Sequence, residues 1–403
     1  MFKSRWLYVI LGVLLVGGLL RQPALVIIAL LTLFTVGVAW AWNRYALVGV
    51  EYQRALSETR VFPGETVALT VRLANRKLIP LAWLELTDKF PSRGEAFAPG
   101  LKLKQNTLAN ASPLRVGYLA HLASLHWYER VSWRYELTAA ARGYYAFGPL
   151  TLRSGDAFGL FEQEERREQI DHLIVYPRLV SLERLGIPSK HPLGETKSPQ
   201  RIFEDPSRTM GIRDYQRGDG FKRIHWKATA RRQALQSRVY EPTATQQLAI
   251  FLNVATFLEA WQGIEPELLE SAITVAASLA SEALEGRYAV GLYANCSLPE
   301  SDQTIKVPPG RSPGQLTAIL EALAKASGFA VMPLENLLDN EAARLPWGAT
   351  LVIVTALVSE GLLSALLRLR QAGHRLTVVT IGERAAMPEG LAGITVHRLG
   401  RIV

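Results

Sequence analysis

Residues 211–232 read GIRDYQRGDGFKRIHWKATARR, and they separate two parts of the chain whose apolar residues follow different patterns. The stretch carries seven Lys or Arg and two Asp, a net charge of +5 against +9 for all 403 residues. A Tyr, a Phe and a Trp are interleaved with these charges. Before the stretch apolar residues alternate with a period of two, and after it short apolar runs alternate with helical patterns. The chain therefore contains two kinds of domain with a basic, aromatic segment between them.

The first 45 residues predict a membrane hairpin. Residues 6–20 and 24–42 are uncharged and apolar, and the link Arg21-Gln22-Pro23 interrupts them. The second segment reaches the roughly 20 apolar residues that a membrane crossing requires, and the first is somewhat short. A signal peptide is the alternative, because the chain starts with basic residues. No small-residue cleavage site follows, and a second apolar segment comes directly after the first, so we favour the hairpin.

Basic residues set the expected orientation of the hairpin. Lys3 and Arg5 precede the first apolar segment, Arg44 and Arg54 follow the second, and only Arg21 lies in the turn. Because cytoplasmic flanks carry the excess of Lys and Arg, both ends of the hairpin are predicted on the cytoplasmic side. The expected location is the cytoplasmic (inner) membrane, with two passes and the bulk of the chain in the cytoplasm.

Composition bounds the remaining possibilities. Hydrophobic residues make up 49% of the chain, enough for a sizeable core. The single cysteine, Cys296, excludes a disulfide within the chain and suits a reducing compartment. A pI of about 9.6 is compatible with binding to nucleic acid or an anionic membrane. Much of the positive charge lies in residues 211–232, however, so the pI describes that segment more than the whole surface.

Residues 46–165 predict a β-sandwich. The apolar side chains of Val67, Leu69, Val71 and Leu73 alternate with smaller or polar ones, after a turn at residues 62–65. Similar short runs follow further along the chain. Several short strands with turns between them predict an antiparallel sandwich of the immunoglobulin or fibronectin type.

Residues 246–403 predict an α/β domain. Short apolar runs alternate with helical patterns, which indicates a mostly parallel sheet covered on both faces. The runs are residues 248–253, 288–293, 349–355, 376–381 and 394–396, and the helical patterns are 266–286, 312–327 and 359–372. In such sheets ligands bind beyond the carboxyl ends of the strands, where the strand order reverses.

The basic segment resembles the signature of the domain of unknown function 58 family. The matching residues are Gly211, Arg213, Tyr215, Gly218, Asp219, Arg223, Ile224, Trp226, Thr229, Ala230 and Arg231. Residues 142–150 resemble the family's RGxYxxGPL segment, and residues 155–161 resemble its DPFGLF segment with Ala157 where Pro is usual. Residues 175–177 read VYP, which also occurs in the family.

The resemblance implies an architecture and partners, and brings no established catalytic activity. The implied fold is multidomain α+β, with a transmembrane hairpin (1–45), an immunoglobulin-like β-sandwich (46–165), a linking signature segment (166–245) and a von Willebrand factor A-like α/β domain (246–403). Family members are typically encoded beside MoxR-type AAA+ ATPases and other von Willebrand A proteins. Such proteins are therefore the expected partners.

Three interpretations of the signature segment remain open. Its Arg residues could pair with Asp214, Asp219 or backbone carbonyls and clamp the sandwich to the α/β domain, because Arg suits fixed, multi-donor contacts. The segment could instead dock an acidic or phosphate-bearing partner surface. Nucleic acid binding is the third interpretation, and the membrane anchor argues against it. The residues expected to carry the clamp or the docking are Arg213, Asp214, Tyr215, Gly218, Asp219, Arg223, Trp226 and Arg231.

The segment also has a local pattern. Gly218 and Asp219 predict a turn followed by a helix cap. Phe221, Ile224, Ala228 and Leu235 then recur at helical spacing, which predicts a buried stripe on a basic helix.

Motifs for catalysis are missing from the sequence. The chain has no G-x-S-x-G, no Walker A and no H-E-x-x-H pattern. His225 could act as a base, but no nucleophile is recognisably paired with it. The leading hypothesis is a non-enzymatic, membrane-anchored scaffold or adaptor without a cofactor. A hydrolase or other enzyme with a site near the signature segment is the alternative, and a nucleic-acid-binding module is another.

The resemblance to von Willebrand A domains raises the question of a metal. Such domains often bind Mg²⁺ through a D-x-S-x-S motif after the first strand, because this ion prefers oxygen ligands in octahedral geometry. Here Asn253 stands at the Asp position, and Ala255 and Phe257 stand at the Ser positions. An amide is a weaker ligand than a carboxylate, and methyl and phenyl groups are no ligands. We therefore expect a domain that has kept the fold and lost the metal.

Overall fold

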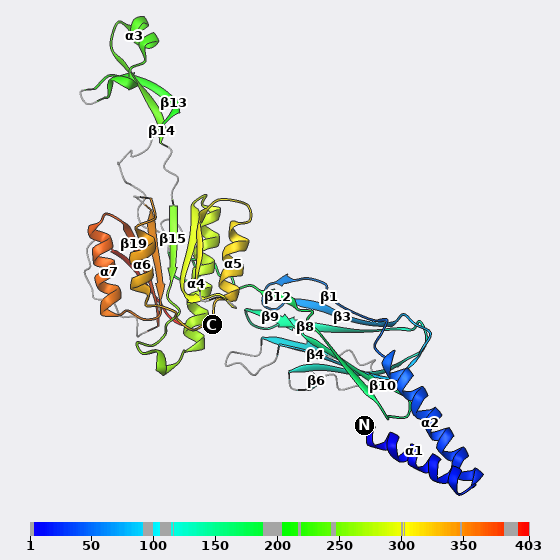
Figure 1. Cartoon of the computed structure of the whole chain (residues 1–403). Helices are drawn as coiled ribbons and strands as arrows, with labels where there is room; N and C mark the ends of the chain where they lie inside the picture. The colour runs from blue at the N-terminus through cyan, green and yellow to red at the C-terminus, as the bar shows by residue number, and fades with distance from the viewer. Residues whose placement is uncertain are drawn as a thin grey trace. The chain divides into compact units, whose positions relative to one another are not determined.

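The computed structural model describes residues 4–91, 100–104, 114–115, 117–187, 204–216, 219–242, 247–299, 301, 303–346, 349–382 and 394–402. Contacts divide the chain into two compact units, Met1–Arg178 and Leu179–Val403. The first contains two apolar helices and a β-rich part, called the β unit below, and the second contains an α/β part, called the α/β unit (Figure 1). The predicted mixed α+β, multidomain class is thus confirmed.

Two helices begin the chain. α1 spans Ser4–Leu19 and α2 spans Pro23–Arg44, and they pack against each other. Pro23 occupies the first turn of α2, where its missing N–H costs no hydrogen bond. Within the described residues α2 is the one helix long and apolar enough to cross a membrane. A helix of this kind near the amino terminus serves either as a membrane span or as a signal sequence.

A lysine ties the end of α2 to the β unit. The Nζ atom of Lys77 donates hydrogen bonds to the carbonyl oxygens of Tyr45, Ala46 and Val48, directly after the helix. A cation at this position stabilises the carbonyl-rich end of a helix. Lys77 therefore fastens α2 to the turn after β3.

The described residues of the β unit contain twelve strands. They are β1 (Val50–Leu56), β2 (Arg60–Val61), β3 (Thr66–Asn75), β4 (Leu81–Lys89), β5 (Leu101–Lys104), β6 (Leu114–Arg115), β7 (Tyr118–Leu125), β8 (Arg130–Ala139), β9 (Gly143–Phe147), β10 (Leu150–Gly155), β11 (Glu162–Arg167) and β12 (Asp171–Val175). They form an antiparallel sheet β1-β3-β8-β5, a second antiparallel sheet β11-β10-β4-β7-β6, and a small mixed sheet β2-β12-β9. The alternation predicted for β3 is confirmed, since Val67, Leu69, Val71 and Leu73 are buried. Buried side chains from all three sheets form one core cluster.

The α/β unit contains the remaining elements. They are β13 (Glu204–Asp214), the 3-10 helix η1 (Phe221–Arg223), α3 (Trp226–Arg232), β14 (Gln236–Pro242), β15 (Gln247–Leu252), the 3-10 helix η2 (Ala260–Gln262), α4 (Pro266–Glu285), β16 (Ala289–Ser297), β17 (Thr304–Gly310), α5 (Gln315–Lys325), α6 (Leu334–Ala342), β18 (Thr350–Thr355), α7 (Glu360–Gln371), β19 (Arg375–Ile381) and β20 (Ile394–Leu399). The expected runs at 248–253, 349–355 and 376–381 are all strands.

The larger sheet of this unit has the order β17-β16-β15-β18-β19-β20. All neighbours are parallel except β16 and β17, so the predicted mostly parallel sheet is confirmed. The strand order reverses between β15 and β18, which places the crevice of such a sheet at their carboxyl ends. α6 and α7 share one core with a single face of the sheet, while α4 and α5 contact each other.

Within the predicted linking segment (166–245), residues 171–175 form β12 of the β unit, whereas β13 and β14 form a separate two-stranded antiparallel sheet. β13 pairs only with β14 in its sheet, and η1 and α3 lie between these two strands in the sequence. We call residues 204–242 the signature arm. β14 ends at Pro242 and β15 begins at Gln247, so the arm joins the larger sheet at the amino end of its first strand.

Candidate functional site

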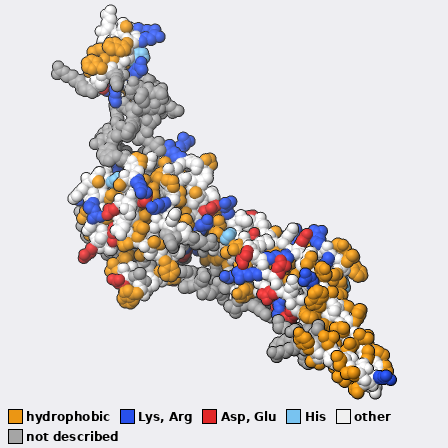
Figure 2. Space-filling view, in the orientation of Figure 1, with side chains coloured by type: hydrophobic (Ala, Val, Ile, Leu, Met, Phe, Trp, Pro, Cys, Tyr) orange, Lys and Arg blue, Asp and Glu red, His pale blue; other side chains and the backbone are white. Residues whose placement is uncertain are grey.

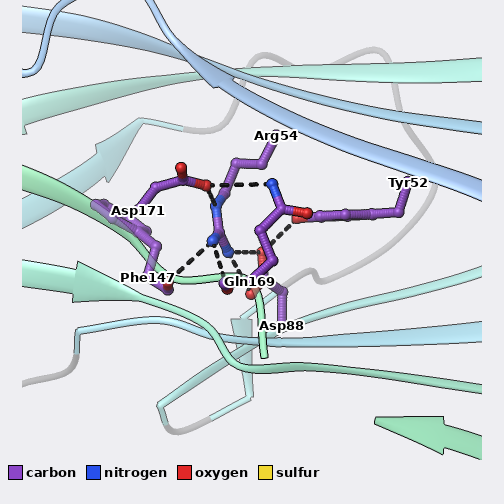
Figure 3. Close-up of polar contacts among 6 residues, drawn as sticks. All are labelled: Tyr52, Arg54, Asp88, Phe147, Gln169 and Asp171. Atoms are coloured by element: carbon purple, nitrogen blue, oxygen red, sulfur yellow. Dashed lines mark hydrogen bonds and ion pairs between the residues drawn. The ribbon is translucent and has the colours of Figure 1, made fainter. Parts of the chain in front are cut away.

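A buried charged cluster in the β unit is the first candidate. Arg54 on β1 is fully buried, and its Nη1 lies 2.7 Å from both carboxylate oxygens of Asp88 on β4. Its Nε donates to Asp171 on β12 at 2.8 Å, and its Nη2 donates to the carbonyl oxygens of Phe147 (2.9 Å) and Gln169 (3.0 Å) (Figure 3). The Arg54 cluster thus connects strands from all three sheets of the unit.

Burial and charge act against each other in this cluster. Burial has the largest single effect and lowers the pKa of Arg54, but the charge of Asp88, Tyr52 and the hydrogen bonds to Asp88 and Asp171 together outweigh it, so the pKa of Arg54 is raised. Tyr52 donates from its hydroxyl to Asp88 at 2.6 Å, and burial followed by the Asp88 charge raises the pKa of Tyr52 far above its usual range. Burial also raises the pKa of Asp88, although the charge of Arg54 and the hydrogen bonds from Tyr52 and Arg54 act in the opposite direction. None of these groups is a nucleophile with a free base beside it. The cluster is a structural connection.

A glycine of the RGxYxxGPL-like segment makes the cluster possible. Gly148 has φ +98°, and a Cβ at this position would lie 2.1 Å from the carbonyl oxygen of Gln169. That oxygen accepts from Arg54, so a side chain on residue 148 would displace a partner of the guanidinium. This glycine lets two loops approach each other around Arg54.

The DPFGLF-like segment also has a structural role. Asp156 is 1% exposed, and its carboxylate accepts from the backbone N–H groups of Phe158 (2.7 Å) and Phe161 (2.5 Å). This closes the turn between β10 and β11. Because Asp156 holds the turn, the turn does not depend on a hydrogen bond from Ala157, which stands where Pro is usual in the family.

His121 is a core side chain of the β unit. It stacks on Trp133 with ring centroids 4.3 Å apart, and its Nε2 lies 3.1 Å from the hydroxyl of Tyr135. Burial lowers the pKa of His121 to about 4, so the ring is neutral at physiological pH.

The signature arm is the second candidate. Arg213 on β13 reaches Asp219 with Nη2 at 2.6 Å, and Asp219 also accepts from the backbone N–H of Gln216. That backbone hydrogen bond and the Arg213 guanidinium lower the pKa of Asp219. Asp214 accepts from the side chain of Gln236 at 2.6 Å. These contacts fix the turn between the strands.

The helix in the arm begins later than the sequence predicted. The N-cap of α3 is His225, whose Nδ1 accepts from the backbone N–H of Ala228 at 3.0 Å, so Asp219 is not the cap. His225 therefore acts as a cap, and that nitrogen is not available as a base. α3 spans only seven residues, from Trp226 to Arg232, and therefore begins after Asp219. Asp219 instead accepts hydrogen bonds from Arg213 and Gln216 in the preceding turn.

The predicted buried stripe on this helix is wrong. Ile224 is buried, but Phe221 is 81% exposed and Leu235 is 46% exposed. The helical spacing is broken because Phe221 lies in η1, before α3, and Leu235 lies after it. Trp226 is also exposed, at 66%.

Exposed aromatic and basic side chains therefore share the arm. Lys227, Arg231 and Arg232 are exposed on the same short helix as Trp226, and Phe221 stands just before it. Figure 2 shows hydrophobic and basic side chains gathered together at the end of the arm. An exposed apolar patch bordered by charge is typical of a docking surface.

The predicted signature residues have different surroundings. Arg213 and Asp219 form an ion pair, Asp214 and Tyr215 support the hairpin, and Arg223 is half-buried. Trp226 and Arg231 are exposed. Gly218 lies outside the described residues. The choice between clamp and docking stays a prediction.

The carboxyl ends of β15 and β18 are the third candidate. Asn253 is 7% exposed, and its amide donates to Thr355 Oγ1 at 3.1 Å. The amide oxygen of Asn253 accepts from Asn295 (2.9 Å) and from the backbone N–H of Ala255 (3.1 Å). Asn295 in turn accepts from the backbone N–H of Val254 at 2.9 Å. The residues at the crevice bind one another.

This arrangement differs chemically from a divalent metal site. Its polar groups are neutral amides and hydroxyls, and Ala255 and Phe257 contribute no ligand atoms at the other two positions of the motif. Across the described residues no group of three His, Cys, Asp or Glu could hold an ion. The oxygen of Asn253 that would face a metal already accepts two hydrogen bonds. The residues present therefore do not fit Mg²⁺, and its loss from this domain stays a prediction.

Comparison with known proteins agrees with the sequence resemblance. Residues 211–390 match the family described as protein of unknown function DUF58. An uncharacterized protein of Bacillus subtilis (strain 168), YeaD, is a distant relative. It is 23% identical over 358 residues, which cover 88% of this chain and 81% of the relative.

Solved structures add little. The CARDB domain of a Pyrococcus furiosus protein, in complex with di-metal ions, is 12% identical, covers 31% of this chain and 89% of its own, and has a TM-score of 0.20. A type I cohesin from Pseudobacteroides cellulosolvens is 10% identical, covers 32% and 94%, and also has a TM-score of 0.20. Likenesses this weak assign neither a fold nor a function to the chain.

Sequence reasoning missed the Arg54 cluster. Arg54 counts among the basic residues after the second apolar segment, whereas the structure pairs its charge with Asp88 and Asp171. One signal was present: Arg54 continues the alternation of Val50 and Tyr52, which places it on the inward face of a strand.

Proposed function

We propose that this protein is a non-enzymatic, membrane-anchored adaptor whose signature arm docks a partner. One observation carries the proposal: Phe221 and Trp226, 81% and 66% exposed, stand beside the exposed cations of α3. Exposed aromatic side chains with Arg neighbours are the usual anchors of protein interfaces. Arg213, Asp214 and Asp219 make polar contacts within the arm, and these contacts stabilise the hairpin that carries Phe221 and Trp226.

The partner we propose is a MoxR-type AAA+ ATPase that presents an acidic surface. The ATPase is proposed from the family resemblance. The positive charge of the arm is the reason to expect a negatively charged surface on the partner. Other von Willebrand A-like proteins are further candidates. Electrostatic complementarity of this kind favours fast and specific association.

The finer architecture belongs to the same proposal. We infer a von Willebrand factor A-like domain in the α/β unit, because the larger sheet, as far as the structure describes it, is parallel apart from β17, which lies at the edge beside β16. An immunoglobulin-like sandwich is inferred for the β unit from its two antiparallel sheets around one core. The anchor is inferred to be a two-pass hairpin of α1 and α2, with the bulk of the chain in the cytoplasm.

Affinity capture from membranes tests the adaptor function. The tagged full chain is captured in mild detergent from membranes prepared without an alkaline or high-salt wash, and co-purifying ATPases are quantified against the double variant Phe221→Ser/Trp226→Ser. We expect ATPase recovery to fall about tenfold or more, because aromatic anchors typically contribute 2 kcal/mol or more. The matched control is Trp127→Ser, at a tryptophan 65% exposed in the β unit. Equal recovery with the arm variant and with the control would refute docking through the arm.

A further inference from the structure

A second exposed apolar surface lies at the carboxyl ends of the parallel strands. The loop between β15 and α4 exposes Leu258 (70%) and Trp261 (82%), and the loop between α5 and α6 exposes Phe329 (70%) and Val331 (47%). Two loops at this edge thus expose four large apolar side chains, and exposed apolar side chains that gather in this way mark binding sites. We call these four residues, together with Glu259, the carboxyl-edge surface.

Hydrogen bonds hold the bases of these two loops together. The side chain of Asn295 accepts from the backbone N–H of Val254 and donates to the carbonyl oxygen of Met332 at 3.1 Å. The backbone carbonyl oxygen of Asn295 accepts from the backbone N–H of Val331 at 2.8 Å. Asn295 thus anchors both loops on β16. The surface is organised before any partner arrives, which lowers the entropic cost of binding.

The same edge of the sheet is acidic. Three of the connections that start or end at this edge, residues 253–267, 326–335 and 355–360, contain five Glu and no Lys, Arg or His. The five are Glu259, Glu265, Glu267, Glu335 and Glu360. Arg401 compensates part of this charge through ion pairs with Glu265 (2.5 Å) and Glu267 (3.0 Å). Glu259 lies between the exposed Leu258 and Trp261, so the patch combines apolar and negative character.

The signature arm has the complementary character. Residues 211–232 carry a net charge of +5, and the arm exposes Phe221 and Trp226 beside its cations. The arm joins the sheet at the amino end of β15, whereas the carboxyl-edge surface lies at the opposite end of the same strands. The arm is therefore joined to the sheet at the amino end of β15, and the carboxyl-edge surface lies at the carboxyl ends of the parallel strands.

We propose that the carboxyl-edge surface binds the signature arm of a second copy of this chain. This inference rests on the proposed role of the arm as a docking element and adds a partner for it. Such a contact is head-to-tail, because each copy offers one arm and one edge, and it leaves a free arm and a free edge at the two ends of every assembly. Contacts of this type build open rows, unlike a two-fold dimer.

Mixing two defective variants tests the proposal on the detergent-solubilised full chain. The arm variant is Trp226→Ser/Arg231→Glu, and the edge variant is Trp261→Ser/Glu259→Lys. Sedimentation velocity over a dilution series should show concentration-dependent oligomers for the unmodified chain. Either variant alone should raise the apparent Kd about tenfold or more. An equal mixture should form dimers and nothing larger, because the intact arm of one variant meets the intact edge of the other only once.

Matched controls make the outcome decisive. Trp127→Ser/Arg130→Glu changes an exposed tryptophan and an exposed arginine in the β unit and should leave assembly unchanged. High salt should weaken the contact, since the screening length falls to about 3 Å at 1 M. A monomeric unmodified chain, unimpaired variants, or a mixture that stays monomeric would each overturn the proposal. So would compaction of the monomer at all concentrations, which indicates that the arm folds onto its own edge.

The edge variant also separates this proposal from the adaptor function. Its arm is intact, so it should still capture the ATPase. Loss of self-association with ATPase capture retained supports both proposals, whereas normal capture with no self-association in any form leaves the adaptor standing and removes the second copy as a partner. Absence of the ATPase from all captures, with normal assembly, removes the adaptor function alone.

Discussion

The Arg54 cluster and the signature arm contain the same kind of ion pair in opposite surroundings. Arg54 and Asp88 lie 2.7 Å apart with side chains 0% and 4% exposed, and Arg213 and Asp219 lie 2.6 Å apart with side chains 32% and 9% exposed. The distances are nearly equal, so distance does not distinguish an ion pair that organises a fold from one that supports a surface. The burial of the pair and the side chains around it do distinguish them.

In the cluster, the guanidinium group of Arg54 donates its hydrogen bonds to groups inside the β unit. Arg54 binds two carboxylates and two carbonyls, and the nearest aromatic side chains are core residues. In the arm, the ion pair fixes a turn while Phe221 and Trp226 remain exposed. A buried pair of this type organises a fold, and a partly exposed pair beside exposed aromatic side chains supports a surface.

The largest expected effect comes from removing the buried arginine. Arg54→Met leaves Asp88 as an uncompensated buried charge, so the free energy of unfolding should fall by about 3–5 kcal/mol. Urea unfolding of the full chain, followed by hydrogen exchange in peptides of β3 and β8, measures the change. The control is Arg153→Met, whose side chain is 45% exposed and pairs with Glu162, and it should leave the free energy of unfolding nearly unchanged. Similar losses for both variants would show that burial does not set the strength of the cluster.

A second, smaller effect is expected from a methyl group beside the cluster. Gly148 and Gly64 both have φ +98°, so alanine strains the backbone equally at the two positions. Only at Gly148 would the new Cβ meet an atom within 4 Å, the carbonyl oxygen of Gln169.

Gly64→Ala should therefore cost about 1 kcal/mol of unfolding free energy, and Gly148→Ala about 1–3 kcal/mol more because of the clash. The same unfolding and exchange measurements apply. Equal losses at the two positions would mean that the loops around Arg54 relax freely.

The smallest effect is expected in the arm. Arg213→Met removes the ion pair with Asp219, which is partly exposed, so the free energy of unfolding should change by about 1 kcal/mol or less. Hydrogen exchange of β13 and β14 should nonetheless rise, because Asp219 loses one of the contacts that hold its turn. A loss as large as that of Arg54→Met would contradict the comparison and favour the clamp interpretation of the signature.

Several elements could be predicted because their pattern is local. The alternation of β3 and the apolar runs of β15, β18 and β19 identify strands that a core must cover. The antiparallel β17 and the helix α6 were not predicted. The strand Thr304–Gly310 carries Lys306 and two prolines, which interrupt an apolar alternation. The apolar residues Leu334, Leu337, Leu338 and Ala342 of α6 do have helical spacing, so this helix was detectable in the sequence.

The candidate sites show where such patterns stop. The spacing of Phe221, Ile224, Ala228 and Leu235 matches a helix, yet the chain turns at His225 and again after Arg232. The cap at His225 and the pairing of β13 with β14 decide which of these side chains are exposed. A spacing rule assumes a continuous helix and cannot detect such turns.

The sequence by itself determined the apolar segments, the β-rich and α/β halves, and the neutral residues Asn253, Ala255 and Phe257 where a metal motif would need acids and hydroxyls. These depend on residue type and near spacing, which act along the chain. Only the tertiary structure decided that Arg54 meets Asp88 and Asp171, 34 and 117 residues away, and that Asn253 meets Asn295 and Thr355. The physical reason is that charge compensation and hydrogen bonding act through space, so their partners are chosen by strand pairing and packing.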